Sequence, residues 1–288
     1  MLVSTMTAHL AKKYGLKAAV SKLIDAGYTA IDVSMCELDK PPYVGDYRAL
    51  AEELLDIAGK AGVKFIQAHA PFGGYEDFMN NIKPRLPRAF EFCGLLGISN
   101  IVVHPILPCD YYGNEEKLFN MNVEFYRSLA PLAKEHGVKI ALENMWGFHP
   151  KAGLVIEHFC ADPKELARLY DVLDDPECFT VCLDFGHVAL CKREPEDAIR
   201  IIGGERLGCI HAHDVDYRQD LHMLPGTVKL NWDEICRALA EVNYKGAFNL
   251  EADGFYKGFF DSQCDTVTKF MADIATSMAE RVEYYRNK

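Results

Sequence analysis

Short apolar runs in this 288-residue chain end repeatedly in histidine, aspartate or glutamate. A carboxylate at the end of a run such as Lys-Ile-Ala-Leu-Glu would be desolvated, which costs several kcal/mol without a partner. A divalent cation removes that cost, and carboxylates with neutral imidazoles suit Mn²⁺, Zn²⁺, Mg²⁺ or Co²⁺. We therefore expect a metal site built from some of these residues: His69, His104, Glu143, Asp184, His187, His211, His213, Asp214 and Glu251, with Asp220 and His222 in the loop after the seventh run.

The apolar runs are spaced regularly and alternate with segments of helical periodicity. The runs, each predicted to be a strand, are 2–7, 29–34, 63–70, 99–105, 138–144, 179–187, 207–214 and 246–252. Apolar residues at i, i+3 and i+4 predict amphipathic helices over 16–27, 47–62, 86–97, 119–137 and 231–243, and a last helix over roughly 261–286. A glycine stands at the end of most of these helices, which is typical of the turn into a following strand.

This alternation predicts a parallel sheet covered by helices. Eight units favour closure into a single-domain (β/α)₈ TIM barrel over residues 1–288. A dinucleotide-binding fold is disfavoured because no Gly-x-Gly-x-x-Gly follows the first strand and because the polar residues are spread over six strand ends. In a barrel, the carboxyl ends of all strands face one cavity, so the polar residues should meet there.

Composition narrows the class of protein. About half of the residues are apolar, and the formal net charge is −11, which weighs against a nucleic-acid surface. Residues 1–15 lack the pattern of a secretory signal, and no apolar stretch is long enough to cross a membrane. The ten cysteines form no Cys-x-x-Cys pair. We expect a cytoplasmic protein with reduced thiols.

Several motifs together resemble one known superfamily. The motifs are HAPFG (69–73), VVHP (102–105), ALEN (141–144), CLDFGH (182–187), IHAHD (210–214), DLH (220–222), PGTVKLNW (225–232) and NLEA (249–252). They resemble the xylose isomerase-like TIM barrels, which include sugar isomerases and epimerases, inosose dehydratases and endonuclease IV. The resemblance spans nearly the whole chain.

By position, the resemblance to ketose 3-epimerases implies a metal held by Glu143, Asp184, His211 and Glu251. It implies that Glu143 and Glu251 also move the substrate proton and that His187 contacts the substrate. The resemblance to endonuclease IV implies further metal ligands, and candidates for a second metal or for substrate contact are His69, His104, His213, Asp220 and His222. The number of metal ions stays open.

The loops favour a small molecule over DNA. The sequences HVALCK and HAHDVD depart from the endonuclease IV pattern, and basic loops that would grip DNA are not evident. The loops after the third and fifth strands instead offer Phe72, Trp146 and Phe148 as walls for a polar ligand with apolar faces. We expect a carbohydrate substrate, not nucleic acid, and the resemblance implies a homo-oligomer.

The sequence leaves the reaction open among related chemistries. Proton abstraction next to the carbonyl of a ketose, keto-inositol or related carbohydrate would make the protein a metal-dependent isomerase or epimerase. A dehydratase or lyase acting on a keto-sugar would share the early steps. An endonuclease IV-type phosphodiesterase with two or three zinc ions, acting on abasic DNA, and a non-catalytic sugar- or metal-binding barrel are the remaining alternatives.

Overall fold

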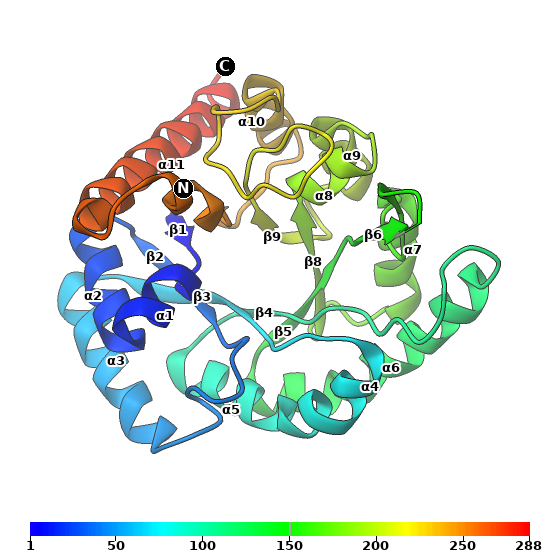
Figure 1. The fold of residues 1–288 in the computed structure, drawn as a ribbon, viewed down its shortest axis with the longest axis horizontal. Helices are drawn as coiled ribbons and strands as arrows, with labels where there is room; N and C mark the ends of the chain where they lie inside the picture. The colour runs from blue at the N-terminus through cyan, green and yellow to red at the C-terminus, as the bar shows by residue number, and fades with distance from the viewer. Residues whose placement is uncertain (150) are drawn as a thin grey trace.

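Parallel strands form a closed ring at the centre of the structure, a computed structural model that describes residues 1–149 and 151–288 (Figure 1). The ring contains, in order, β1 (Val3–Thr5), β2 (Ala30–Ser34), β3 (Lys64–His69), β4 (Asn100–Val102), β5 (Lys139–Glu143), β8 (Phe179–Asp184), β9 (Leu207–His211) and β10 (Phe248–Leu250). Strand β1 pairs with β10, and single bridges join Met6 to Asp32 and Ala212 to Leu250, which closes the ring. The predicted (β/α)₈ barrel is confirmed.

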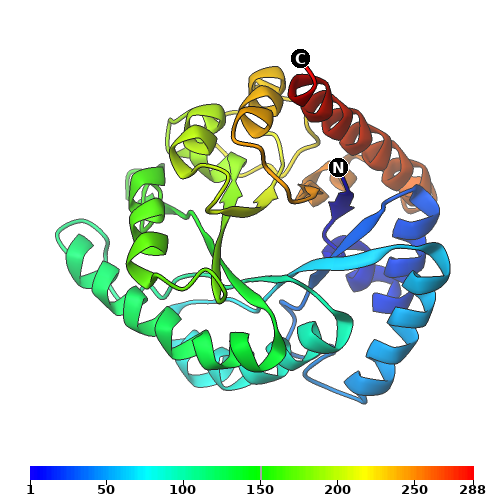
Figure 2. The ribbon, with the colours of Figure 1, turned by 180° about the vertical axis from the view of Figure 1, so that it is seen from behind.

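Most of the helices surround this ring on the outside, whereas α1 and α8 lie closer to its axis (Figures 1 and 2). The helices are α1 (Ala8–Tyr14), α2 (Leu16–Ala26), α3 (Tyr47–Ala61), α4 (Tyr75–Asp77), α5 (Leu86–Leu96), α6 (Glu115–His136), α7 (Pro163–Leu173), α8 (Phe185–Leu190), α9 (Pro195–Ile202), α10 (Trp232–Glu241) and α11 (Cys264–Arg286). Helix α11 packs against α10 and α2 and thereby completes the outer layer. Within the described residues, none of the helices combines the length and apolar character needed to span a membrane.

The predicted helix ends agree with the structure, because glycine ends the helices where expected. Gly27 has φ of 102° and Gly62 has φ of 70°, a left-handed conformation that is costly for other residues. The prediction for 179–187 differs from the structure. Strand β8 ends at Asp184, whose side chain accepts a hydrogen bond of 2.6 Å from the backbone N–H of His187 and so caps α8. His187 therefore lies in the first turn of a helix.

The loop after β5 contains an antiparallel hairpin that the sequence patterns did not predict. It consists of β6 (Trp146–His149) and β7 (Leu154–Glu157), with Trp146 opposite Glu157. The hairpin lies outside the ring of parallel strands, near α7 (Figure 1). Its strands are mostly not buried, so they lack the buried apolar runs by which the barrel strands were recognised.

One buried aspartate organises the loop between β9 and α10, which carries Asp220 and His222. The carboxylate of Asp214 accepts five hydrogen bonds, from the backbone N–H groups of residues 226, 228, 229 and 230 and from the indole N–H of Trp232, all between 2.9 and 3.0 Å. This explains why a fully buried carboxylate is tolerated at this position without a cation. Asp214, which belonged to the set of candidate metal ligands, therefore has a structural role.

We expect Asp214→Ala to lower the free energy of unfolding by about 3 kcal/mol, because buried N–H groups lose their acceptor. Chemical denaturation of the variant measures this loss. The matched exchange Asp25→Ala, at an exposed position of α2, should change stability little. Equal stabilities of the two variants would contradict the role assigned to Asp214.

Candidate metal centre and cavity

Three carboxylates surround a single nitrogen atom at the carboxyl ends of the strands. Nδ1 of His211 lies 2.6 Å from Oε1 of Glu143, 2.8 Å from Oε2 of Glu251 and 3.7 Å from Oδ2 of Asp184. The strands determine this geometry: Glu143, Asp184 and His211 are the last residues of β5, β8 and β9, and Glu251 directly follows β10. The structure thus brings together the four residues that the sequence predicted as metal ligands.

The donor atoms of this cluster fit a divalent cation. An imidazole nitrogen carries at most one proton, so Nδ1 of His211 can point a linear hydrogen bond at only one of the two glutamates. In addition, the buried Oε2 atom of Glu143 makes no hydrogen bond to any described residue, although Nε2 of His104 lies 2.9 Å away. Unsatisfied buried oxygens beside an imidazole are the ligand set that Mn²⁺, Zn²⁺ and related ions prefer.

The titration behaviour of the cluster reflects its charge. Burial alone would lower the pKa of His211, but the carboxylates of Glu251 and Glu143 raise it well above its usual value. Burial would likewise raise the pKa of Glu143, yet His211 and His104 hold it well below its usual value. The negative charge of this cluster therefore requires a positive partner, either an imidazolium or a bound cation.

Two further histidines adjoin the cluster on the side of β3 and β4. The ring of His69 stacks on that of His211 with centroids 4.4 Å apart, and its Nδ1 lies 3.4 Å from Asp32. His104 lies against Glu143, and Phe72 stacks on its ring at 4.4 Å. His69, Glu143, His211 and Glu251 could share one ion by distance. Both histidines are thus adjacent to the cluster, as predicted.

A second group of potential ligands lies on the side of β9. His213, Asp220 and His222 approach one another closely enough to share an ion, and the rings of the two histidines stack with centroids 4.2 Å apart. Nε2 of His213 lies 3.0 Å from both oxygens of Asp184, whereas its buried Nδ1 has no hydrogen-bond partner within residues 1–149 and 151–288. A side chain at Gly186 would come within 2.0 Å of the His213 ring, so glycine is needed there.

A buried polar layer beneath the cluster was missed by the sequence patterns. Asp32 accepts hydrogen bonds from Gln67 at 2.8 Å and from Asn249 at 3.0 Å, and the amide nitrogen of Gln67 also lies 2.9 Å from Nε2 of His211. Gln67 and Asn249 each precede a strand-end residue, His69 or Glu251, by two positions. Because side chains two apart in a strand share one face, this spacing could have revealed the layer.

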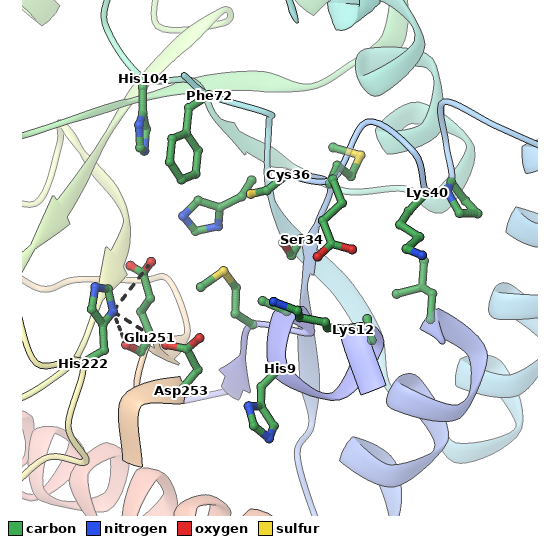
Figure 3. Close-up of a pocket in the computed structure, with 18 of the residues that line it drawn as sticks. His9, Lys12, Ser34, Cys36, Lys40, Phe72, His104, His222, Glu251 and Asp253 are labelled. Carbon is green, nitrogen blue, oxygen red and sulfur yellow. Dashed lines mark hydrogen bonds and ion pairs between the residues drawn. The ribbon is translucent and has the colours of Figure 1, made fainter. Parts of the chain in front are cut away.

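The cluster opens into a cavity of about 1130 Å³. Figure 3 shows His104, Phe72, His222 and Glu251 around this space. The predicted residues that line it are His69, Phe72, His104, Glu143, Trp146, His187, Asp220, His222 and Glu251. Asp184, His211 and His213 are fully buried and do not line it.

One residue that the sequence predicted as a wall of the cavity, Phe148, lies elsewhere in the structure. Phe148 does not line the cavity, and 56% of its surface is exposed. It lies on β6, within the hairpin that leads away from the barrel, whereas Trp146 at the start of the same strand stays near His187 with ring centroids 6.4 Å apart. Sequence alone could not distinguish the two aromatic residues because the hairpin was not predicted.

Comparison with known proteins agrees with this architecture. Residues 20–266 match the sequence model of the family described as xylose isomerase-like TIM barrel. The chain belongs to this family. An uncharacterised protein of Methanocaldococcus jannaschii is 25% identical over 207 residues, 69% of this chain and 67% of that protein. An uncharacterised protein of Sinorhizobium fredii is 28% identical over 169 residues, 58% of this chain and about half, 51%, of that protein.

Solved structures with the same fold include sugar epimerases. A D-psicose 3-epimerase matches with a TM-score of 0.74 and 18% identity, covering 99% of this chain and 100% of that one. A D-tagatose 3-epimerase-like protein matches with a TM-score of 0.70 and 20% identity over 97% of this chain and 100% of that one. The 3-keto-D-glucoside 4-epimerase of E. coli matches with a TM-score of 0.71 and 16% identity over 96% and 99%. At these identities the similarity establishes the fold.

His222 of the second group predicts a dependence of stability on pH. Burial would lower the pKa of His222, but Asp220 and Glu251 raise it from 6.5 to about 10. A raised pKa stabilises the fold fully below pH 6.5, and this stabilisation is lost as the pH rises through about 10. We expect chelator-treated protein to lose free energy of unfolding over this interval, and His222→Gln to lose less of it.

Denaturant titrations at several pH values measure this effect. His136→Gln, at the end of α6, serves as the control and should follow the unsubstituted protein. If His222→Gln and the unsubstituted protein show the same slope against pH, the electrostatic contribution assigned to His222 is wrong.

Proposed function

We propose that this protein is a divalent-metal-dependent sugar isomerase or epimerase that abstracts a proton next to the carbonyl of a small carbohydrate. The observation that carries the proposal is the position of three carboxylates around Nδ1 of His211 at the base of a cavity. Phe72 and Trp146 add apolar walls that suit the faces of a sugar ring. The structural neighbours include a D-psicose 3-epimerase, which supports this class of reaction.

In this proposal Glu143, Asp184, His211 and Glu251 hold the ion. A cation at this position supplies Lewis-acid stabilisation for the negative charge that develops on the substrate oxygen after proton abstraction. The chain must keep the ligands deprotonated, and it does so for Glu143 and Glu251: despite burial, the neighbouring histidines hold the pKa of both carboxyls well below the usual range. At neutral pH both glutamates are therefore carboxylates, the form that binds a cation.

Glu143 and Glu251 are the proposed proton-transfer residues. They approach His211 from different strands, β5 and the end of β10, and both line the cavity. A substrate carbon held between them can lose a proton to one glutamate and regain it from the other, which inverts its configuration in an epimerase. Return of the proton to the neighbouring carbon would give an aldose–ketose isomerase.

His187 is the proposed contact for a substrate hydroxyl. Its Nδ1 lies 2.9 Å from the backbone oxygen of Asn144, which favours a proton on this nitrogen. Nε2 lies 3.7 Å from Asp220, near the cavity that His187 lines. Asn144 also exchanges hydrogen bonds of 2.8 and 2.9 Å with the backbone of Asp184 and so fixes the two strand ends relative to each other.

A lyase acting on a keto-sugar would use the same proton abstraction and would then expel a hydroxyl in place of returning the proton. Such an enzyme also needs an acid beside the departing oxygen. His187 and His222 both line the cavity, and despite burial the nearby aspartates and glutamates raise the pKa of each to about 10. Product analysis after incubation with a ketose separates dehydration from epimerisation.

We expect Glu251→Gln to abolish metal-dependent proton exchange because the variant loses a proposed ligand and a proposed base together. The assay incubates metal-loaded protein with a panel of ketoses and keto-inositols in D₂O and follows incorporation of deuterium by NMR. Elemental analysis should find one Mn, Co or Mg per chain, lost in the variant.

The matched control is Glu52→Gln at an exposed position of α3, which should retain both metal and exchange. Exchange that persists in Glu251→Gln at the rate of the unsubstituted protein would refute the assigned role. Failure of every substrate in the panel to exchange, with one metal bound, would refute the proposed reaction class.

An endonuclease IV-type phosphodiesterase is the second candidate, favoured by the close grouping of His213, Asp220 and His222 beside the first cluster. That activity requires two or three zinc ions. Under the epimerase proposal, His222→Ala should leave one metal per chain and mainly raise KM. Close to three zinc ions per chain, a loss of zinc in His222→Ala and cleavage of abasic DNA would together support the nuclease instead.

A further inference from the structure

The cavity is larger than one sugar ring requires. Its volume of about 1130 Å³ lies above the range of roughly 300–1,000 Å³ that is typical of pockets for drug-sized ligands, and a single sugar is smaller than such ligands. The proposed metal ligands Glu143 and Glu251 occupy one end of it. A substantial part of the space therefore lies beyond the reach of a sugar bound at the metal centre.

The remaining space, which we call the side lobe, has mostly apolar walls, although Ser34 and Glu37 also line the cavity. Its lining residues Ala11, Leu16, Met35, Pro41 and Leu50 come from α1, α2, the segment after β2 and α3. These elements belong to the first fifth of the chain, whereas most of the metal centre comes from its second half. The side lobe is continuous with the metal centre because both line one cavity.

Charged groups lie at the rim of the side lobe. Lys12 and Lys40 line the cavity with exposed side chains, and Figure 3 places them on the side away from His222 and Glu251. Lys17 also lines the cavity and pairs with Glu53 at 2.7 Å. Long lysine side chains typically keep their charged ends in water while their stems cover apolar surface. The lysines therefore leave the apolar walls available to a ligand.

The chemistry of the two ends differs. The metal centre offers carboxylates and imidazoles, which suit hydroxyl and carbonyl oxygens. The side lobe offers Leu16, Pro41 and Leu50, against which a sugar hydroxyl would lose its hydration without gaining a hydrogen bond. A ligand that fills both ends must be polar at one end and apolar at the other.

We propose that the substrate of this site is a keto-glycoside, a sugar that carries a ring ketone and is joined to an apolar aglycone, with the keto-sugar at the metal centre and the aglycone in the side lobe. This inference rests on the proposed function and narrows its substrate class. It assigns the preference for the aglycone to Leu16 and its neighbours and not to the residues that hold the metal.

The test compares methyl and phenyl β-D-glucopyranoside, two unreactive analogues that lack the ketone, share the sugar and differ in the aglycone. Isothermal titration calorimetry on the metal-loaded full chain should give a Kd for the phenyl glucoside at least tenfold lower, because only its ring fills apolar space. Leu16→Asp should remove this difference while leaving the Kd of the methyl glucoside unchanged.

Leu16→Asp is expected to fold because Leu16 is the first residue of α2, where an acidic side chain interacts favourably with the helix dipole. The control Leu55→Asp makes the same exchange at an exposed position of α3 outside the cavity and should keep the preference for the phenyl glucoside. Equal affinities for the two glucosides, no binding of the phenyl glucoside at millimolar concentration, or a preference that survives Leu16→Asp would each overturn the inference.

The two proposals fail in distinguishable ways. Metal-dependent proton exchange on a ketose, together with equal affinities for the two glucosides, would retain the proposed function and reject the glycoside. A preference for the phenyl glucoside in a protein that exchanges no proton would reject the proposed reaction and leave an apolar side lobe that binds ligands without this chemistry.

Discussion

The approach of Glu143, Asp184 and Glu251 to Nδ1 of His211 is the interaction on which the rest of the site depends. Buried charges of the same sign repel one another strongly because little water screens them. The chain opposes this repulsion with imidazoles: His104 lies against Glu143, and His213 lies between Asp184 and the loop that carries Asp220. The same arrangement offers a divalent cation a site at which the carboxylates are already held together.

Two levels of support hold this arrangement in place. The strands fix Glu143, Asp184 and His211 through hydrogen-bonded register, in which Asp184 lies directly beside His211. Beneath them, Asp32 joins Gln67 and Asn249 in a buried layer that contacts the far side of the His211 ring. Ligands on strands with a second layer of hydrogen bonds are held more precisely than ligands on loops.

The loops of a barrel shape the cavity around a site that the strands hold. Asp214 fixes the segment that presents His222, and the β6–β7 hairpin places Trp146 at the cavity. The segments around α1 and after β2 form the apolar side lobe. Conserving a metal centre on the strands while changing the loops is the usual way in which one barrel fold serves different substrates. A shared family and fold therefore do not by themselves identify the substrate.

The sequence by itself determined the barrel and the set of residues at its mouth, because strand and helix periodicities are local and parallel strands in a barrel direct every carboxyl end to one side. Only the tertiary structure decided which side chains approach one another. It placed three carboxylates on His211, assigned Asp214 to a loop and moved Phe148 away from the cavity. The side lobe likewise depends on segments 8–18 and 35–50 meeting in space. Such contacts between distant segments leave no periodic pattern in the residues that make them.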